Sequence, residues 1–304
     1  MQKLKIAITG AGGFIGSHLT EVFEREPVST VLISGAYGNI KHYAEGITVD
    51  ICDFDHLKEH LLGSDIVIHL AGLNSVRDSF DHPSETLKVN TIGTSTLLSV
   101  CKDLGINRII MISSAEVYGI PSSNSVSESE ILKPLSPYGI SKVAIEQLCF
   151  VYHKAYGMKF QILRPFSIYG PGMSPKSLIK EIYNHVKLKQ NISLFNCAST
   201  RDYCYVKDLA NAIKLSAYNE FRGFNIYNVA SGVGINSKQL AELIQSIMQT
   251  SGIILESPSP DRPRNTDVNY LVANTEKIAL ELNWTAQTSM LDGLIKTIHS
   301  FERE

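Results

Sequence analysis

The chain lacks the features that mark secreted, membrane-bound and nucleic-acid-binding proteins. No apolar run is long enough to span a bilayer, and glycines interrupt the apolar stretch that begins at Ile6, so we expect neither a membrane anchor nor a secretion signal. The 28 lysines and arginines nearly balance the 30 aspartates and glutamates, and no basic patch suggests nucleic acid. The five cysteines are odd in number and scattered. They argue against a disulfide framework or a zinc cluster and favour reduced thiols in the cytoplasm.

Length and composition set further limits. A chain of 304 residues can bury a substantial core, in one large domain or two linked ones. It contains no internal repeat and no low-complexity tract. His56 and His60 have the i, i+4 spacing that two metal ligands on a helix can use, but no third candidate ligand is near them in the sequence. We therefore expect an exposed helix face there and no metal site.

Segments typical of strands and of helices alternate through about residue 165. This alternation predicts a parallel sheet covered by helices on both faces. Strands are expected at 4–9, 30–34, 47–50, 66–70, 108–113 and 159–164, and helices at about 13–25, 55–62, 84–104 and 137–156. The remainder mixes short strands with helices near 175–189, 206–218, 237–250, 274–282 and 289–302.

A glycine-rich segment directly follows the first predicted strand. It contains Gly10, Gly13 and Gly16, with Ile15 where the common dinucleotide fingerprint has its third glycine. A strand, a glycine turn and a helix in this order are typical of a dinucleotide site. The glycines allow a tight turn, close approach of a pyrophosphate and close packing of helix on sheet, and the helix N-terminus faces the phosphates. A glycine turn without a ligand is the alternative.

Tyr138 and Lys142 are four positions apart near the start of the helix expected at 137–156. That spacing places both side chains on one helix face, and Ser136 and Pro137 are typical of an N-cap and a first helical residue. A neighbouring cation and the positive helix end both favour the phenolate of a tyrosine, whose ordinary pKa is about 10. The pair can therefore act as an acid or base near neutral pH. For the pair alone, a surface contact is the alternative.

These two motifs belong to an ordered set that resembles the extended short-chain dehydrogenase/reductase superfamily, in its nucleotide-sugar epimerase/dehydratase branch. The matching segments are 9–16, 69–72, 88–90, 93–94, 113–119, 138–142, 163–172 and 200–203. The resemblance implies an α/β fold with a Rossmann-type doubly wound parallel sheet and a smaller C-terminal α+β substrate lobe. Residues 1–166 would bind the dinucleotide, with returning segments at about 200–230, and 167–304 would mostly form the lobe.

The resemblance also implies catalytic roles for four residues. Ser114 would hydrogen-bond the sugar oxygen, Tyr138 would exchange its proton, and Lys142 would hold the nicotinamide ribose and favour the phenolate. Oxidising an alcohol requires a base for the hydroxyl proton while carbon releases a hydride. Glu116 would accept a hydrogen bond from a substrate hydroxyl or be a spectator.

The cofactor implied by the resemblance is NAD, with NADP possible. Ser34 ends the second predicted strand, where an acidic residue usually binds the ribose of NAD. A serine could accept the 2′-phosphate of NADP, but no arginine is next to it, so NAD is favoured. Asp50 and Ile51 would lie against the adenine, although Asp50 could equally cap a loop. The full expected set is Gly10, Gly13, Phe14, Ile15, Gly16, Ser34, Asp50, Ile51, Leu70, Ala71, Gly72, Asn90, Tyr138, Lys142 and Pro165.

The segment after the fifth predicted strand bears on the reaction type. Dehydratases of the family carry an Asp–Glu pair that removes water, but here Ala115 stands at the Asp position, which disfavours a 4,6-dehydratase. Decarboxylating relatives keep a glutamate where Glu116 stands, so decarboxylation stays open.

We predict an NAD(P)-dependent nucleotide-sugar 4-epimerase. The alternatives are a 4-keto-6-deoxy-sugar reductase that consumes NADPH and a non-catalytic, redox-sensing dinucleotide-binding protein.

The expected partner is a nucleotide diphosphate sugar, whose base and sugar are left open. By resemblance it would contact Ser114, Glu116, Ser167, Arg201 and Arg264, with Arg262 able to replace Arg264. Arginine suits a diphosphate because it is a planar, bidentate donor. The family also implies a homodimer through the helices expected at 84–104 and 137–156. Apolar positions that fit this interface, or equally the core, are Leu97, Leu98, Cys101, Ile145, Leu148 and Phe150.

Overall fold

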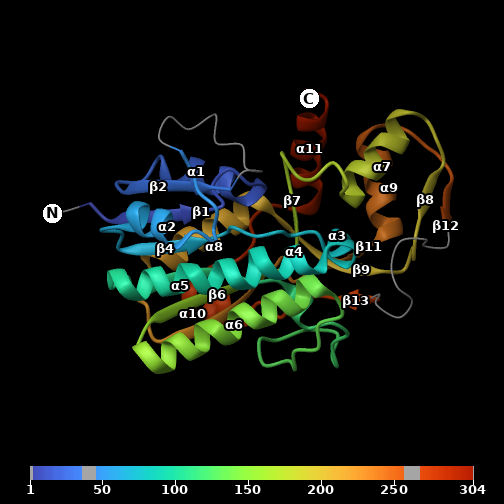
Figure 1. Ribbon diagram of the computed structural model, residues 1–304. Helices are drawn as coiled ribbons and strands as arrows, with labels where there is room; N and C mark the ends of the chain where they lie inside the picture. The colour runs from blue at the N-terminus through green and yellow to red at the C-terminus, as the bar shows by residue number, and fades with distance from the viewer. Residues whose placement is uncertain (1–2, 36–45, 257–267, 304) are drawn as a thin grey trace.

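A seven-stranded parallel sheet forms the centre of the computed structural model, which describes residues 3–35, 46–256 and 268–303 (Figure 1). The strand order is β10-β6-β5-β4-β1-β2-β3. The bounds are β1 Lys5–Thr9, β2 Ser29–Ser34, β3 Ile47–Thr48, β4 Ile66–His69, β5 Arg108–Ile112, β6 Lys159–Pro165 and β10 Phe224–Val229. The reversal of strand order between β1 and β4 is the point where a doubly wound sheet opens a crevice at the carboxyl ends of its strands. The predicted fold class is confirmed.

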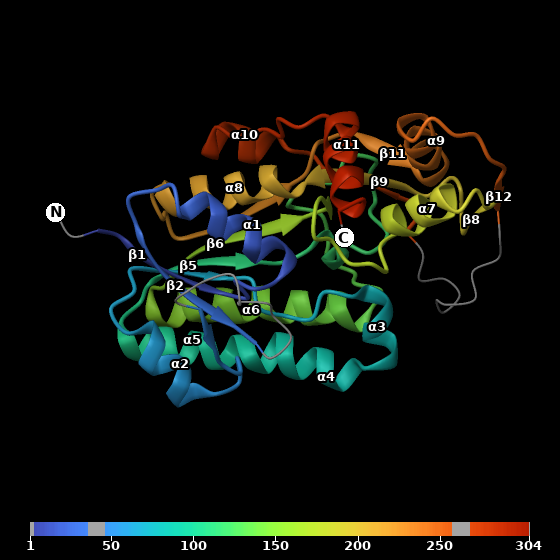
Figure 2. The same cartoon turned by 90° about the horizontal axis from the view of Figure 1, so that it is seen from above.

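Helices cover both faces of this sheet (Figure 2). One face carries α1 (Phe14–Phe23), α8 (Val206–Tyr218) and α10 (Glu276–Leu282), and the other carries α2 (Phe54–Leu61), α5 (Gly93–Leu104) and α6 (Pro137–Tyr156). Two separate apolar cores result, one on each side of the strands. Because both faces are covered, the central strands are apolar almost throughout, and all four residues of β4 are buried.

The helix expected at 84–104 is present but not uniform. It consists of α4 (Pro83–Leu87), one π-helical turn at Lys88–Ile92 and then α5. The π turn carries Asn90 at its centre, and such turns are frequent at functional sites. Two short elements near the crevice were not predicted: α3 (Val76–Asp81) and a 3₁₀ turn at Ala115–Val117.

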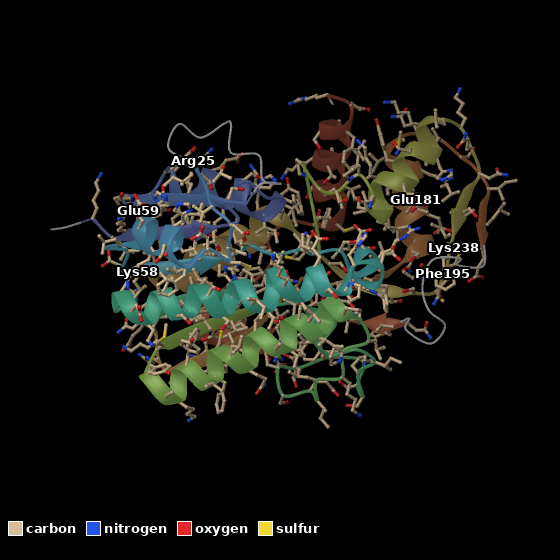
Figure 3. All side chains as sticks on the ribbon, viewed as in Figure 1. Arg25, Lys58, Glu59, Glu181, Phe195 and Lys238 are labelled. Atoms are coloured by element: carbon tan, nitrogen blue, oxygen red, sulfur yellow. The ribbon has the colours of Figure 1, made fainter. Side chains whose placement is uncertain are left out.

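The C-terminal part of the chain builds a smaller lobe beside the carboxyl ends of the sheet. One small sheet contains β7 (Ser167–Tyr169), β9 (Thr200–Tyr205), β11 (Gly234–Asn236) and β13 (Tyr270–Leu271), and β8 (Ile192–Leu194) pairs with β12 (Ile254–Glu256). A third apolar core lies among α7 (Leu178–Lys187), α9 (Ser237–Ile247) and α11 (Met290–Phe301). Glu181, Phe195 and Lys238 project from this lobe, whereas Arg25, Lys58 and Glu59 project from the sheet part (Figure 3).

Several late segments return to the main sheet. α8 packs against α1, β10 pairs with β6, and α10 packs against β10. β9 immediately precedes α8 but belongs to the sheet of the lobe. The chain therefore crosses between the two parts more than once, and these crossings hold the lobe against the crevice. None of the helices in the described ranges is long and apolar enough to cross a membrane.

Candidate active site

A cleft of about 930 Å³ lies between the carboxyl ends of the strands and the lobe. Its walls come from the glycine turn, the ends of β4, β5 and β6, the start of α6, and the lobe. Lining residues from the two sides include Gly13, Gly72, Ser114, Tyr138, Lys142, Pro165, Ser167, Lys176 and Arg201. The cleft therefore brings together motifs that are far apart in the sequence.

The glycine turn at one end of the cleft is required by close packing. Gly10 has a φ of +76°, and a Cβ at Gly16 would lie 2.2 Å from the carbonyl oxygen of Gly10, so neither position has room for a side chain. Gly13 differs, because a Cβ there would meet only the Gly10 oxygen, at 3.2 Å. Gly13 is exposed to the cleft. Its missing side chain leaves the backbone open to a ligand.

The N-terminus of α1 faces the same space. Gly13 is its N-cap, no side chain of the described residues caps the helix, and the first turn contains no acidic residue. Free N–H groups and the positive end of the helix dipole are a ready-made site for phosphate. The turn therefore offers the features of a phosphate site, and its role in binding a dinucleotide stays a prediction.

The helix that carries Tyr138 and Lys142 begins as predicted. The Ser136 hydroxyl accepts a hydrogen bond from Gly139 N over 3.0 Å, and Pro137 is the first helical residue. The Lys142 Nζ atom lies 5.7 Å from the centroid of the Tyr138 ring. Ser114, just after β5, lies close enough to the Tyr138 side chain to influence its pKa, and all three predicted catalytic residues line the cleft, so they form one cluster.

The protonation state of this cluster differs from the sequence-based expectation. Burial raises the pKa of Tyr138 to about 12; the hydrogen bond from Ser114 opposes this rise, and the charge of Glu116 adds to it. Burial also lowers the pKa of Lys142 to about 8, opposed by Glu146. Sequence reasoning counted only the cation and the helix end, which favour phenolate. Removal of both groups from water outweighs those effects in the protein alone.

Residues 115 and 116 both line the cleft from the 3₁₀ turn after β5. The Ser114 Oγ atom accepts a hydrogen bond from Glu116 N over 3.2 Å and so fixes the start of this turn. Ala115 is buried, and Glu116 is half-buried with its carboxylate charge acting on Tyr138. The turn therefore presents one methyl group and one carboxylate to the cleft.

Ten of the expected cofactor residues line the cleft and five do not. Those in the cleft wall are Gly10, Gly13, Phe14, Ile15, Gly16, Leu70, Gly72, Tyr138, Lys142 and Pro165. Of the others, Ser34 is buried at the end of β2, Ala71 is half-buried, and Ile51 packs where a Cβ on Gly93 would stand. Asp50 is exposed, and its Oδ1 accepts a hydrogen bond from Cys52 N over 2.9 Å. Asp50 thus makes the contact of a loop cap, and its place against the adenine stays a prediction.

Asn90, the remaining member, braces the cleft wall from behind. Its Oδ1 accepts from Leu73 N over 2.8 Å, and its Nδ2 donates to Leu73 O and to the Ser141 hydroxyl, each over 2.9 Å. A single buried amide thereby joins the loop after β4 to the helix that carries the catalytic pair. Asn90 therefore fixes the position of the cleft-lining loop at Leu73 relative to α6.

Four of the five expected substrate residues, Ser114, Glu116, Ser167 and Arg201, line the cleft. The Arg201 Nη1 atom donates to Ser199 Oγ over 2.8 Å and to Thr200 O over 3.0 Å. These bonds hold the guanidinium against β9. Arg264 and its alternative Arg262 lie outside the described residues.

Sequence reasoning missed a salt bridge that crosses the cleft. Lys176 Nζ, from the lobe, lies 3.2 Å and 3.4 Å from the two carboxylate oxygens of Asp78 in α3, and both residues line the cleft. The two positions are 98 residues apart, and no local pattern marks them as partners.

A buried histidine beside the site was also missed. His69 Nδ1 lies 2.7 Å from Thr9 Oγ1, and His69 Nε2 lies 2.9 Å from Thr94 Oγ1. Because Thr94 Oγ1 donates to Asn90 O, it must accept from the imidazole, which places the proton on Nε2. Burial, with a smaller effect of Lys142, lowers the pKa of His69 to about 3. The strand-end motif 69–72 was the signal that could have identified it.

Comparisons with known proteins agree with this site. A model of the NAD dependent epimerase/dehydratase family matches residues 6–230. A putative UDP-glucose 4-epimerase of Methanocaldococcus jannaschii is 30% identical over 307 residues, which cover 97% of each chain. The structure of a UDP-glucose 4-epimerase of Thermotoga maritima with UDP-glucose superposes with a TM-score of 0.88 at 26% identity, over 99% of both chains. That of a dTDP-glucose 4,6-dehydratase of Streptomyces venezuelae with NAD bound gives 0.90 at 26% identity, over 99% and 98%. The chain belongs to the NAD dependent epimerase/dehydratase family.

Proposed function

We propose that this enzyme is a nucleotide-sugar 4-epimerase that oxidises C4 of the sugar transiently and returns the hydride to the opposite face. The observation that carries the proposal is the convergence of Ser114, Tyr138 and Lys142 in a cleft that also contains the glycine turn. A hydroxyl, a phenol and an ammonium at one point supply what reversible oxidation of an alcohol needs. The relatives named as UDP-glucose 4-epimerases support this reaction.

The described residues fit NAD as the cofactor. The Gly13 position leaves the backbone open, and the uncapped end of α1 suits a pyrophosphate. Lys142, Gly72 and Pro165 line the same cleft and would hold the nicotinamide end. Bound NAD supplies a reversible hydride acceptor. NADP is the alternative, since no acidic residue ends β2.

Residues of the chain itself would transfer the hydroxyl proton of the sugar. Tyr138 would take the hydroxyl proton of the sugar and give it back, while Ser114, which acts on the phenol, would hydrogen-bond the reacting oxygen. Lys142 donates to Ile112 O over 2.8 Å, which aims its ammonium group along the cleft wall beside the phenol. A fixed positive charge there favours phenolate and so lowers the barrier to proton transfer.

Elimination of water is disfavoured by the 3₁₀ turn. A dehydratase needs an acid and a base to remove water, and of the turn's two cleft-lining residues only Glu116 carries a carboxyl group. Glu116 would instead accept a hydrogen bond from a substrate hydroxyl. A nucleotide-4-keto-6-deoxy-sugar reductase using NADPH is the second candidate, and the absence of an acidic residue at Ser34 is the observation that favours it.

The partner we propose is a nucleotide diphosphate sugar held between the two parts of the molecule. Arg201 and Lys176 supply positive charge on the lobe side of the cleft, and Ser167 supplies a hydroxyl. Residues 1–166, with α8 and β10, would bind the dinucleotide, and most of 167–304 would bind the sugar nucleotide. UDP-hexoses are the first compounds to test, because a similar structure contains UDP-glucose.

We also propose a homodimer in the cytoplasm. Of the apolar positions named from the sequence, Leu97, Leu98, Cys101 and Ile145 are core residues. Phe150, from the same set, is 41% exposed, and Ile92, Ile140 and Val151 on the π turn and α6 are between 51% and 56% exposed. These would form the interface. The five cysteines, all within the described residues, form no disulfide, which suits a reducing compartment.

The test is cofactor stoichiometry. Purified protein is given UDP-, GDP-, dTDP- or CDP-sugars, either with catalytic NAD or with excess NADPH, and absorbance at 340 nm is followed together with the products. An epimerase interconverts C4 epimers without net change in reduced cofactor. Turnover that occurs only with stoichiometric loss of NADPH identifies the reductase instead, and cofactor binding without turnover of any sugar nucleotide identifies the non-catalytic alternative.

A further inference from the structure

Behind the catalytic face of α6, Glu146 and Arg164 form an ion pair in which each side chain is only 2% exposed. Arg164 Nε donates to Glu146 Oε1 over 2.9 Å, and Nη2 donates to Oε2 over 2.6 Å. Such two-point contacts are the strongest and most directional pairs that arginine makes. Glu146 is one helical turn after Lys142 and so faces the same side of α6.

This pair joins the strand ends that form the floor of the cleft. The Ser113 hydroxyl donates to Glu146 Oε1, and Ser113 immediately precedes Ser114 at the end of β5. Arg164 immediately precedes Pro165, the cleft-lining residue at the end of β6. One carboxylate therefore holds the ends of β5 and β6 against the helix that carries Tyr138 and Lys142.

The same pair reaches the 3₁₀ turn and the last strand of the main sheet. Arg164 Nη1 donates to Tyr118 Oη over 2.8 Å, and Tyr118 Oη donates to Asn228 Oδ1 over 2.6 Å. Tyr118 follows the turn that presents Glu116, and Asn228 is in β10. Every polar atom in this chain of contacts has a partner, as a buried polar network requires.

The charge of Glu146 also acts on Lys142. Burial lowers the pKa of Lys142 to about 8, and Glu146 opposes that effect. Three titratable groups act on or face Lys142: Tyr138 and Glu146 from α6, and His69 from β4. His69 is buried and neutral at pH 7, and Tyr138 is a neutral phenol in the protein alone. Of these three, only Glu146 places a negative charge beside the ammonium group.

We propose that Glu146 is a positioning residue of the active site: its carboxylate, one helical turn from Lys142, holds the ends of β5 and β6 against α6 through Ser113 and Arg164. Its negative charge also favours the ammonium form of Lys142. The inference rests on the proposed function for its catalytic consequence, but the charge of Lys142 is a property of the protein alone. Arg164 is the partner that makes a buried carboxylate tolerable, because an unpaired one would be strongly destabilising.

The charge is measured without substrate. The protein is treated with limiting acetic anhydride at pH values from 6 to 10, and acetylation of the peptide that contains Lys142 is followed by mass spectrometry, with the exposed Lys189 as internal reference. We expect a reactivity midpoint near pH 8 in the unaltered protein. In Glu146→Gln the midpoint falls by about one pH unit or more, since loss of a nearby opposite charge shifts a pKa by that amount.

Because Glu146→Gln leaves Arg164 unpaired and can unfold the chain, a second variant is needed. Glu146→Gln/Arg164→Gln removes both charges, and its midpoint must also lie below that of the unaltered protein. Glu59→Gln, at an exposed glutamate on α2, is the matched control and leaves the midpoint unchanged. Glu146→Asp keeps the charge but shortens the side chain, so it should retain the midpoint while kcat falls several-fold.

Two outcomes would overturn the proposal. One is an unchanged Lys142 midpoint in both the single and the double variant, whatever happens to their melting temperatures, which would make the pair merely structural. The other is full kcat in Glu146→Asp with a midpoint shifted as in Glu146→Gln. A lowered midpoint in a protein that turns over no sugar nucleotide would refute the proposed function and leave the electrostatic role of Glu146 standing.

Discussion

The ammonium group of Lys142 donates a hydrogen bond to the backbone carbonyl of Ile112 across 2.8 Å. This bond fixes the Lys142 side chain at the end of β5. This bond orients a charged group that has been almost entirely withdrawn from water, with only 8% of the residue exposed. A buried ammonium is costly, and its retention beside Tyr138 indicates a functional demand.

Replacement of Lys142 by methionine should lower activity but raise stability, because it removes a buried ammonium group that the reaction needs. We expect activity to fall by about 10²–10⁴-fold, the usual effect of a proton-transfer group. The pKa of Lys142 lies below its ordinary value, so the folded state binds fewer protons than the unfolded state between about pH 8 and pH 10.5. The unaltered protein therefore gains stability as pH rises through that window and loses it as pH falls.

The methionine variant has no such dependence. Relative to the unaltered protein it should be more stable at pH 7, by about 1–3 kcal/mol, and this advantage should shrink by pH 10. Urea denaturation at the two pH values measures the difference. An equal difference at pH 7 and pH 10 would show that Lys142 is not held with a lowered pKa.

His69 should make the protein sensitive to acid. Its two hydrogen bonds require the neutral imidazole, and its pKa is lowered to about 3, so its stabilising contribution is present above pH 6.5 and is lost as pH falls toward 3. At pH 5 the loss is about 2 kcal/mol. The free energy of unfolding should therefore fall less between pH 7 and pH 5 in His69→Gln than in the unaltered protein, by about 2 kcal/mol. Denaturation of both proteins at the two pH values measures this difference. Identical pH dependence in both proteins would contradict the neutral, buried state.

Two glycines of the turn should respond differently to alanine. Gly16→Ala places a Cβ 2.2 Å from a backbone oxygen, so we expect a melting temperature lowered by several degrees and loss of NAD binding. Gly13→Ala meets only one atom, at 3.2 Å, and has ordinary φ, so the fold should persist while affinity for NAD falls about tenfold or more. Calorimetry of both variants tests this. Unchanged NAD affinity in Gly13→Ala would place the pyrophosphate elsewhere.

The proposed dimer interface can be disrupted on α6. Ile140 and Val151 are 51% and 55% exposed and lie three helical turns apart on one face. Ile140→Asp/Val151→Asp should convert a dimer to a monomer in sedimentation velocity. Leu280→Asp, at an 85% exposed residue of α10 on the other face of the sheet, is the control and should remain a dimer. A monomeric unaltered protein would end this proposal.

Periodicity and local motifs predicted most of the fold. The helices expected at 137–156 and 206–218 have those bounds, and the other predicted helices outside the divided 84–104 segment begin and end within three residues of the expected positions. Each of these helices buries one continuous apolar face, so its apolar residues recur with helical periodicity in the sequence. The π turn around Asn90 left none, because it depends on hydrogen bonds to Leu73 and Ser141.

The site was predictable as a set of residues but not as an electrostatic environment. Ser114, Tyr138 and Lys142 were identified from spacing and family resemblance, and they meet in one cleft. The directions of their pKa shifts depend on burial, which no local pattern reports. For the same reason the pairing of Glu146 with Arg164 could not be foreseen, since it depends on α6 crossing β6.

Transient oxidation at C4 can be tested by following the sugar hydrogens. UDP-glucose, or another UDP-hexose that the protein converts, is incubated with the protein and catalytic NAD in D₂O and followed by proton NMR. If C4 is oxidised transiently and the hydride is returned, the product is the C4 epimer, with the hydrogen at C4 retained and no deuterium at C5. A product that has lost water and gained deuterium at C5 or C6, or a 4-keto sugar that accumulates with reduced cofactor, would contradict it.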